Sequence, residues 1–113
     1  RGGKGIVMDY RIRSSNAWVS VAYTRSKSLP WSLEGGNEGG SNYIEHIKKD
    51  GTINKYSVVT GLSLEPEDII RIHTANGGGY GKPEERDKNL IEDDILNEYI
   101  TPQQAKKYYN FGK

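Results

Sequence analysis

The chain has 113 residues, of which 34% are hydrophobic, so we expect a single modest core. It contains no cysteine, which excludes thiol catalysis, disulfide bonds and thiolate metal sites. Sixteen Lys and Arg against fifteen Asp and Glu give a net charge of +1, too balanced for strong phosphate neutralisation. No stretch approaches the roughly 18 apolar residues of a membrane helix, and no signal peptide is recognisable. We expect a cytoplasmic protein whose partners include neither nucleic acid nor a membrane.

The N-terminal part predicts a β-hairpin. Residues 6–13 alternate between apolar and polar side chains, the period of a half-buried strand. After a short polar turn, residues 19–23 alternate again, which favours pairing with the first strand. Between residues 26 and 42 Gly and Pro replace the alternation, so we expect a long loop there. Fixing such a loop costs backbone entropy, and Trp31 and Leu33 are its expected anchors.

A second hairpin follows the loop. Residues 43–49 and 52–59 flank Asp50 and Gly51, a pair that suits a two-residue type I′ turn with positive φ at both positions. The alternation in the first of these strands is imperfect, so a bulge or an edge position is left open.

The last strand is expected over residues 69–74, after a tight turn at Pro66 and Glu67. It leads directly into a second glycine loop at residues 76–81.

Helical periodicity appears only after Pro83. Ile91, Ile95 and Tyr99 are four apart, with Asp87 as a plausible N-cap. A second helix is predicted by the capping box of Thr101 and Gln104, by Pro102, and by a buried side formed by Ala105, Tyr108 and Tyr109.

These elements predict one domain over residues 1–113, β-rich over 1–81 and helical over 84–112. Strands come first and helices last, so the fold class is α+β and mainly β. We expect an antiparallel sheet or small barrel of about five strands, followed by two short C-terminal helices.

The glycine loop at residues 76–81 invites comparison with phosphate-binding loops, since successive glycine amides can cradle an anion. Neither the dinucleotide fingerprint nor the P-loop spacing is met, and Pro83 follows where a helix should open. We expect these glycines to adopt positive φ or to let another backbone come close. The alternative is a loop that lines a site shared with other protein.

The titratable residues show no catalytic pattern. His46 and His73 are the only histidines and lack acidic residues at a metal-ligand spacing, so both are expected to be solvated. The acidic run at residues 92–94 is expected on a solvated helix face, since consecutive helical residues point in different directions.

The first strand carries three charged residues on one face, Asp9, Arg11 and Arg13. Such a row suits an anion or an interface, but charges on a wet strand face are common, and we expect this simpler state. No serine stands in a nucleophile elbow. The sequence therefore assigns no catalytic residue and no metal ligand.

Five short motifs follow one another along the chain. They are GGKGIV at 2–7, PWSLEGG at 30–36, PED at 66–68, GGGYGKP at 77–83, and a closing helix with Thr101, Pro102, Ala105 and Tyr109. In this order they resemble the C-terminal end of the hydantoinase B/5-oxoprolinase family, which includes N-methylhydantoinase B and relatives of the acetone carboxylase alpha subunit. The resemblance extends from about Gly3 to Gly112. A start at Arg1 without methionine also suggests a segment of a larger protein.

Some positions depart from the family pattern. Glu67 stands at a frequent turn glycine, and Asn76 replaces the first of four glycines. We expect the backbone to be kept, because Glu67 suits a type I turn and Asn76 tolerates positive φ.

The resemblance implies that the parent is the large subunit of an ATP-dependent cyclic amidohydrolase, a hydrolase that opens a hydantoin or 5-oxoproline ring. It implies ATP and a divalent metal for the parent complex, with the metal ligands in other sequence, and no cofactor in this chain. The implied partners are the remainder of the large subunit, a hydantoinase A-type ATPase subunit or domain, and a small cyclic amide substrate.

In such an enzyme the two glycine loops would line or close the site and would supply no catalytic groups. The candidate substrate-loop residues are Trp31, Gly35, Gly36, Gly77, Gly78, Gly79 and Tyr80. One alternative is a structural or subunit-interaction module with exposed tyrosines at its interface. Another is an independent anion- or nucleotide-binding protein.

Overall fold

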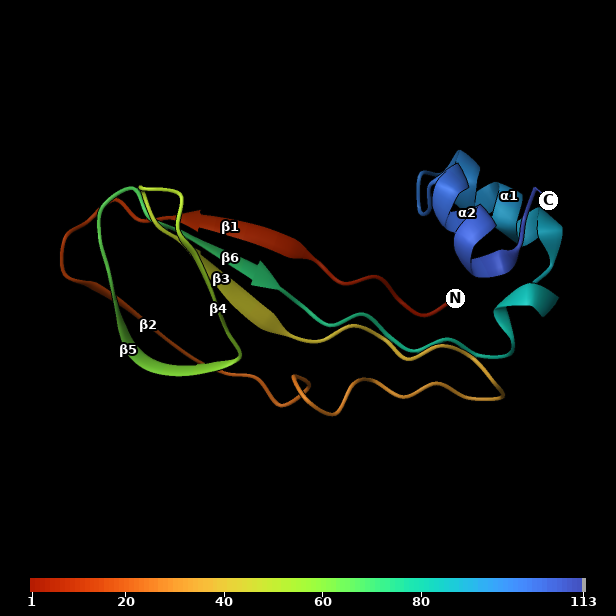
Figure 1. Ribbon diagram of the computed structural model, residues 1–113, viewed down its shortest axis with the longest axis horizontal. Helices are drawn as coiled ribbons and strands as arrows, with labels where there is room; N and C mark the ends of the chain where they lie inside the picture. The colour runs from red at the N-terminus through yellow and green to blue at the C-terminus, as the bar shows by residue number, and fades with distance from the viewer. Residues whose placement is uncertain (113) are drawn as a thin grey trace.

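A computed structural model describes residues 1–112. The elements are β1 (Val7–Arg11), β2 (Ala17–Ala22), β3 (Tyr43–Ile47), β4 (Ile53–Tyr56), β5 (Val58–Leu64), β6 (Ile69–His73), a 3-10 turn η1 (Pro83–Glu85), α1 (Lys88–Leu96) and α2 (Pro102–Tyr109). The strands form two antiparallel sheets, one in the order β1-β6-β3-β4 and one of β2 and β5. The molecule is elongated, with the sheets at one end and the helices at the other (Figure 1). The expected α+β, mainly β class is confirmed, and the sheets do not close into a barrel.

The first two strands do not form the expected hairpin. β1 pairs with β6, and β2 pairs with β5 in the other sheet. Asn16, with a φ of 65°, lies in the turn where the chain passes from one sheet to the other. Alternation identifies a strand but not its partner, so the sequence could not show that β1 and β2 belong to different sheets.

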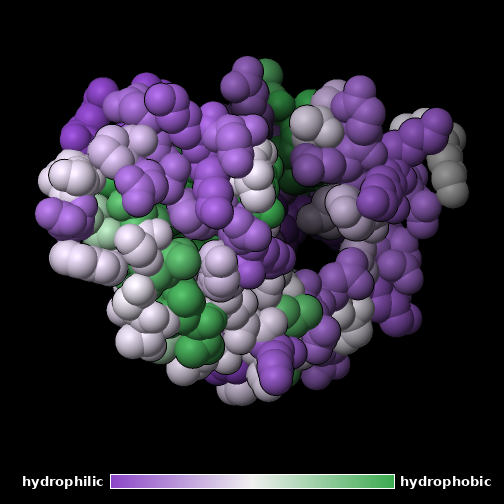
Figure 2. Space-filling model, turned by 60° about the vertical axis from the view of Figure 1, so that its left-hand side comes forward, coloured by the Kyte–Doolittle hydropathy of each residue, from purple (hydrophilic) through white to green (hydrophobic). Residues whose placement is uncertain are grey.

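The core lies between the two sheets. Ile44 on β3 and Ile70 on β6 face Leu64 on β5, and all three are buried. A ring of partly buried side chains surrounds them: Ile12, Ala17, Val19, Val21, Tyr23, Tyr56, Val59, Leu62 and Ile72. Elsewhere hydrophobic side chains are exposed in separate patches on a mainly hydrophilic surface (Figure 2). The core is as modest as the composition predicts.

The outer face of the four-stranded sheet carries a row of alternating charges. Arg71 donates from Nε and Nη2 to the two carboxylate oxygens of Asp9, at 2.8 Å each. The strand register places Glu45 beside Arg71 and Lys55 beside Glu45. The signs therefore alternate across all four strands, the favourable arrangement for cross-strand neighbours. The expected wet charged face on β1 is confirmed.

The second hairpin is confirmed, but its turn differs from the expected type. Only Gly51 has a positive φ, 87°. The amide of Gly51 donates to the carbonyl of Lys48, and the amide of Lys48 donates to the carbonyl of Thr52. These bonds enclose a three-residue loop with a left-handed glycine at its end, not a type I′ turn. The φ of Asp50 is not positive, and its carboxylate accepts the amide of Thr52 at 2.8 Å.

The expected strand over residues 52–59 is interrupted at Ser57, where the chain leaves one sheet and enters the other. The bulge lies further on, where the register between β2 and β5 shifts between Val19 and Val21. Gly61, with a φ of 63°, sits opposite this shift, and its amide donates to the hydroxyl of Ser20. A left-handed glycine is what this kind of bulge requires.

The turn before β6 requires a positive φ at Glu67, 74°, and the amide of Asp68 donates to the carbonyl of Glu65. This geometry is a type II turn, so the expected type I turn is wrong. It also explains why glycine suits this position. The carboxylate of Glu67 pairs with Arg11 and Arg13, at 3.5 and 3.1 Å.

Asp68 and His46 form a buried pair at one end of the sandwich. His46 Nε2 lies 2.6 Å from Asp68 Oδ2, and the amides of Lys49 and Glu65 also donate to this carboxylate. The expectation of a solvated His46 is wrong, because His46 shares the inward face of β3 with Ile44 and is 3% exposed. Burial raises the pKa of Asp68, but the hydrogen bonds from His46 and the two amides outweigh it, so the pKa lies below its usual value.

Replacing Asp68 with Asn should lower the free energy of unfolding by about 3 kcal/mol at pH 7, because the buried hydrogen bonds of its carboxylate to His46 and to two amides are lost or weakened. A folded-state pKa below the unfolded value stabilises the protein above about pH 4. That stabilisation is lost as the pH falls through the folded pKa, so the difference between wild type and variant should shrink at pH 3.

Urea unfolding at the two pH values measures this difference. Asp93→Asn is the control, since this carboxylate is exposed and makes no side-chain hydrogen bond, so it should contribute little. Equal stability of Asp68→Asn and wild type at pH 7 would show that the contact between Asp68 and His46 does not stabilise the fold.

Candidate functional site

Three extended segments run side by side between the sheets and the helices (Figure 1). We call residues 1–6, 30–42 and 74–81 the glycine bundle. The hydrogen bonds between the segments run from the amide of Gly77 to the carbonyl of Gly3, from Gly79 to Asn37, from Leu33 to Gly79 and from Gly81 to Leu33, at 2.9–3.1 Å. The long loop expected between residues 26 and 42 is confirmed, and it is held through its backbone. The expected side-chain anchors are wrong, since Trp31 and Leu33 are 69% and 57% exposed.

The glycines are required where the segments touch. A Cβ on Gly39 would collide with the carbonyl of Asn76, and a Cβ on Gly36 would lie 2.5 Å from the carbonyl oxygen of Gly79. Gly36 and Gly39 are three positions apart, and so are the residues that they touch, Gly79 and Asn76. Three residues is the period of the polyproline II conformation. Gly2 and Gly5, also three positions apart, make contacts of the same kind. A Cβ on Gly2 would meet the carbonyl of Gly77, and a Cβ on Gly5 would meet the carbonyl of Thr74.

In the loop at residues 76–81 the expected close approach of another backbone is confirmed for Gly77 and Gly78, and the expected positive φ for Gly81. Asn76 does not adopt the expected positive φ. Its side-chain oxygen accepts the amide of Gly40. The amides of Gly77, Gly79 and Gly81 are already bonded to protein carbonyls. They therefore cannot cradle a phosphate in this arrangement, which argues against a nucleotide loop.

Both helices begin as the sequence predicts, but α1 ends at Leu96, before Tyr99, which the periodicity placed on the same helical face. Asp87 caps α1 by accepting the amide of Asn89 at 2.8 Å. Thr101 and Gln104 form the capping box of α2, with both reciprocal bonds present. Ala105 is buried as expected, while Tyr108 is 49% exposed, although the sequence predicts it on the buried side. The hydroxyphenyl group of Tyr108 instead reaches the cleft described below.

Asp94 joins the helices to the glycine bundle. Its Oδ1 accepts Arg1 Nε at 3.0 Å, and its Oδ2 accepts Arg86 Nη2 at 2.9 Å. The expected solvated face is wrong for Asp94, which is 6% exposed because it lies three residues after the buried Ile91 on the same side of α1. Arg1 also lies over the ring of Tyr99, 4.5 Å from its centroid.

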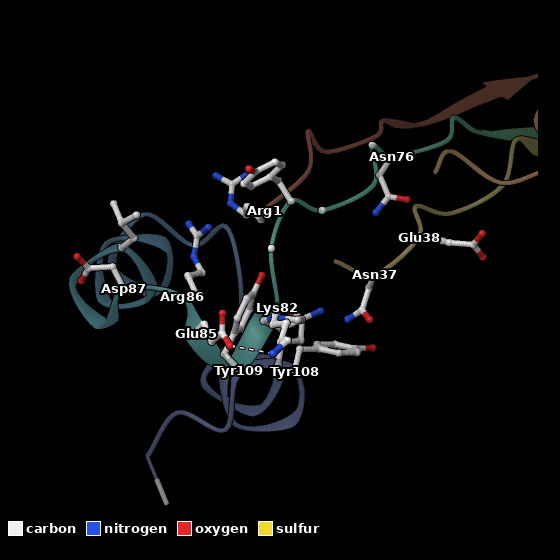
Figure 3. A pocket seen from close by; sticks show the side chains of 17 residues that line it. Arg1, Asn37, Glu38, Asn76, Lys82, Glu85, Arg86, Asp87, Tyr108 and Tyr109 are labelled. Carbon is white, nitrogen blue, oxygen red and sulfur yellow. Dashed lines mark hydrogen bonds and ion pairs between the residues drawn. The ribbon is translucent and has the colours of Figure 1, made fainter. Parts of the chain in front are cut away.

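A cleft of about 650 Å³ opens between the glycine bundle and residues 82–112, which we call the helical tail (Figure 3). Asn37 and Asn76 reach it from the glycine bundle, whereas Arg86, Tyr108 and Tyr109 reach it from the tail. Its charged lining residues are Arg1, Lys82 and Arg86 with Glu38, Glu85 and Asp87. The three positive and three negative groups balance, so the cleft suits a small polar molecule that offers both donors and acceptors.

The cleft gathers some of the sequence-predicted residues. Gly77, Gly79 and Tyr80 line it. Gly36 and Gly78 instead pack inside the glycine bundle, where a Cβ on Gly78 would meet the carbonyl of Trp31. The ring of Trp31 lies outside the cleft beside Arg25, with 5.7 Å between the guanidinium and the ring centroid. Gly35 is a left-handed turn residue.

Sequence reasoning missed several cleft residues, namely Asn37, Arg86, Gln104 and the exposed side of Tyr108. Only their polarity could have signalled them, because they come from distant parts of the chain. Within residues 1–112 no group of three or more His, Asp or Glu side chains could hold a metal ion. None of the described helices is long and apolar enough to cross a membrane.

Residues 1–83 match the family described as Hydantoinase B/oxoprolinase. Because the match covers most of the chain, the protein belongs to this family. Its relatives include an uncharacterized protein of Methanocaldococcus jannaschii, 39% identical over 111 residues, which are 96% of this chain and 19% of the relative. No solved structure matches significantly.

Two further relatives carry functional names. A protein of Pestalotiopsis fici named "5-oxoprolinase PfmaA" is 30% identical over 88% of this chain and 8% of its own length. A Pseudomonas protein, named as the putative B subunit of a D-/L-hydantoinase, is 27% identical over 96% of this chain and 19% of its own. The chain thus spans less than a fifth of the length of these relatives.

Replacing Gly39 with Ala should lower the free energy of unfolding by about 2–3 kcal/mol, because the methyl group forces the glycine bundle apart. Gly3→Ala is the matched control, since a Cβ at Gly3 meets nothing within 4 Å, and it should change stability by less than about 0.5 kcal/mol. Thermal and urea unfolding compare the two. Equal effects would mean that close backbone contact is not what the bundle requires.

Replacing Asp94 with Asn should loosen the helical tail by about 2 kcal/mol, because two charge-assisted hydrogen bonds weaken. Limited proteolysis should then cut residues 82–100 faster than in wild type. Asp93→Asn is the control, since the neighbouring carboxylate is exposed and makes no side-chain bond. Unchanged cleavage of Asp94→Asn would show that something other than this carboxylate fixes the tail.

Proposed function

We propose that this chain is the C-terminal part of the large subunit of an ATP-dependent cyclic amidohydrolase. In this role the cleft between the glycine bundle and the helical tail lines or closes the site where a hydantoin or 5-oxoproline ring is opened. The observation that carries the proposal is the cleft itself, which combines balanced charge with many amide and hydroxyl groups. A cyclic amide presents an N–H donor and a carbonyl acceptor on one small ring, which such a lining can match.

The residues of the cleft suit positioning better than chemistry. Ring opening needs a polarised carbonyl and a placed nucleophile, and the cleft contains neither histidine nor cysteine. Two of its three carboxylates have other partners, since Glu85 pairs with Lys82 and Asp87 caps α1. The amides of Asn37 and Gln104 and the hydroxyl of Tyr108 are then the groups that would hold the ring.

In this proposal the remainder of the large subunit and a hydantoinase A-type ATPase subunit or domain complete the enzyme. The Pseudomonas relative is named as one subunit of a hydantoinase, which fits an enzyme built from several chains. When bound in the complex, ATP would activate the ring carbonyl by phosphorylation. The bonded amides of the glycine loop and the pairing of Asp94 with two arginines leave no evident place for ATP or a divalent metal in residues 1–112. Both would be held by the other parts of a cytoplasmic complex.

A second candidate role is a non-catalytic module for subunit interaction. The observation that favours it is the exposure of Trp31, Leu33 and Tyr80, between 57% and 75%, on neighbouring segments of the glycine bundle. Leu33 and Tyr80 lie side by side in a short parallel bridge. Exposed aromatic and aliphatic side chains grouped in this way are typical of interface cores.

A substitution in the cleft separates the two roles. In the assembled complex Tyr108→Ala should lower kcat/KM for hydantoin or 5-oxoproline opening about tenfold, the loss of roughly 1.4 kcal/mol of transition-state stabilisation. Leu96→Ala, on an exposed helix position outside the cleft, should leave turnover unchanged. If both variants assemble and turn over like wild type, the chain acts only at the interface.

Removing the chain gives the broader test. The large subunit and its ATPase partner are assayed with and without residues 1–113. Identical ring-opening activity in both samples would refute the proposed role.

A further inference from the structure

β1 lies at the edge of the four-stranded sheet, next to β6 on one side and to nothing on the other (Figure 1). All five of its residues are exposed. The bonds at its two ends fix which backbone groups point outward. The amide of Thr74 donates to the carbonyl of Ile6, and the amide of Ile12 donates to the carbonyl of Asp68.

In an antiparallel pair the hydrogen-bonded residues alternate along each strand. The backbone N–H and C=O groups of Ile6 and Ile12 point toward β6, and so do those of Met8 and Tyr10 between them. The N–H and C=O groups of Val7, Asp9 and Arg11 therefore point away from the sheet. Among residues 1–112 no other segment bonds to these outward groups.

The usual protections of an edge strand are missing from β1. It contains no lysine, proline or bulge. Its two charged side chains are already paired within the sheet, Asp9 with Arg71 and Arg11 with Glu67. At the opposite edge, β4 is one residue shorter and carries Lys55, as protected edges do.

Two apolar side chains of β1 itself are also uncovered. Met8 and Tyr10 lie on the same face as the buried Ile70, yet they are 42% and 51% exposed. The two-stranded sheet does not extend over them. An added strand next to β1 would cover both side chains. It would also form hydrogen bonds with the outward N–H and C=O groups of Val7, Asp9 and Arg11.

We propose that the free edge of β1 pairs with an extended segment from the remainder of the large subunit. The relatives carry at least four-fifths of their length outside the matched region, so such a segment is available. The charge row adds a specific feature: the signs alternate from Lys55 through Glu45 and Arg71 to Asp9. The incoming strand places a lysine or arginine beside Asp9 and an apolar side chain beside Met8 or Tyr10.

A second copy of this chain is a poorer occupant. Two β1 strands that pair symmetrically about their central residue would place Asp9 opposite Asp9, and like charges directly opposite are destabilising. The proposal rests on one part of the proposed function, that this chain belongs to a larger subunit, and not on the role of the cleft. Its test therefore uses backbone protection, and turnover decides the proposed function separately.

Amide hydrogen exchange at single-residue resolution in the full-length large subunit tests the proposal. The amides of Val7, Asp9 and Arg11 are expected to exchange at least tenfold more slowly than in a free peptide. Exchange less than tenfold slower would overturn the proposal. Protection that falls on dilution of the subunit would also overturn it, because a second copy would then be the partner.

A proline substitution supplies the matched comparison. Asp9→Pro removes the central outward donor of β1, a position where an edge strand tolerates proline. Val7 and Arg11 are expected to lose their protection at least tenfold, while protected amides of Met8 and Tyr10 show that β1 still pairs with β6. Lys55→Pro, at an outward position of β4 in the same charge row, should leave Val7 and Arg11 protected. Unchanged protection in Asp9→Pro, or equal loss in both variants, contradicts strand addition at β1.

Discussion

Direct contact between peptide backbones at the glycines is the constraint on which the rest of this structure depends. Residues 74–81 lie between two other segments, and a side chain at Gly36, Gly39 or Gly78 would meet a carbonyl group. The contacts set how the loop after β2 and the segment before β1 meet the end of β6. They also form one wall of the cleft, whose lining includes Gly77 and Gly79.

Two buried carboxylates fix the ends of this arrangement. Asp68 ties His46 to two turns at one end of the sandwich. Asp94 joins Arg1 and Arg86 where the helices meet the glycine bundle. Each carboxylate is nearly excluded from water and is satisfied by several donors, the condition under which a buried charge is tolerated. Fold and cleft therefore depend on a few polar contacts as much as on the small apolar core.

Local features of the sequence predicted the strands, the helix caps and the need for glycine, since alternation, Asp87 and Thr101 act through near neighbours. Partners distant in the sequence could not be predicted in this way. The pairing of β1 with β6 joins strands about 60 residues apart, which alternation within either strand does not reveal. The burial of His46 and Asp94 depends on what packs over them, and the cleft joins residues as far apart as Asn37 and Tyr108. One observation could have signalled the positive φ of Glu67, namely that the family pattern often has glycine at this position.

The glycine bundle also has a thermodynamic consequence. Its contacts join amide and carbonyl groups and bury little hydrocarbon, whereas exposure of apolar surface is the main source of the heat-capacity change on unfolding. Separating these segments should therefore change the heat capacity much less than opening the sandwich does. Cooling, which weakens hydrophobic cohesion, should affect the sandwich and leave the bundle comparatively intact. The wall of the cleft and the core of the sheets would then differ in how their stability responds to temperature.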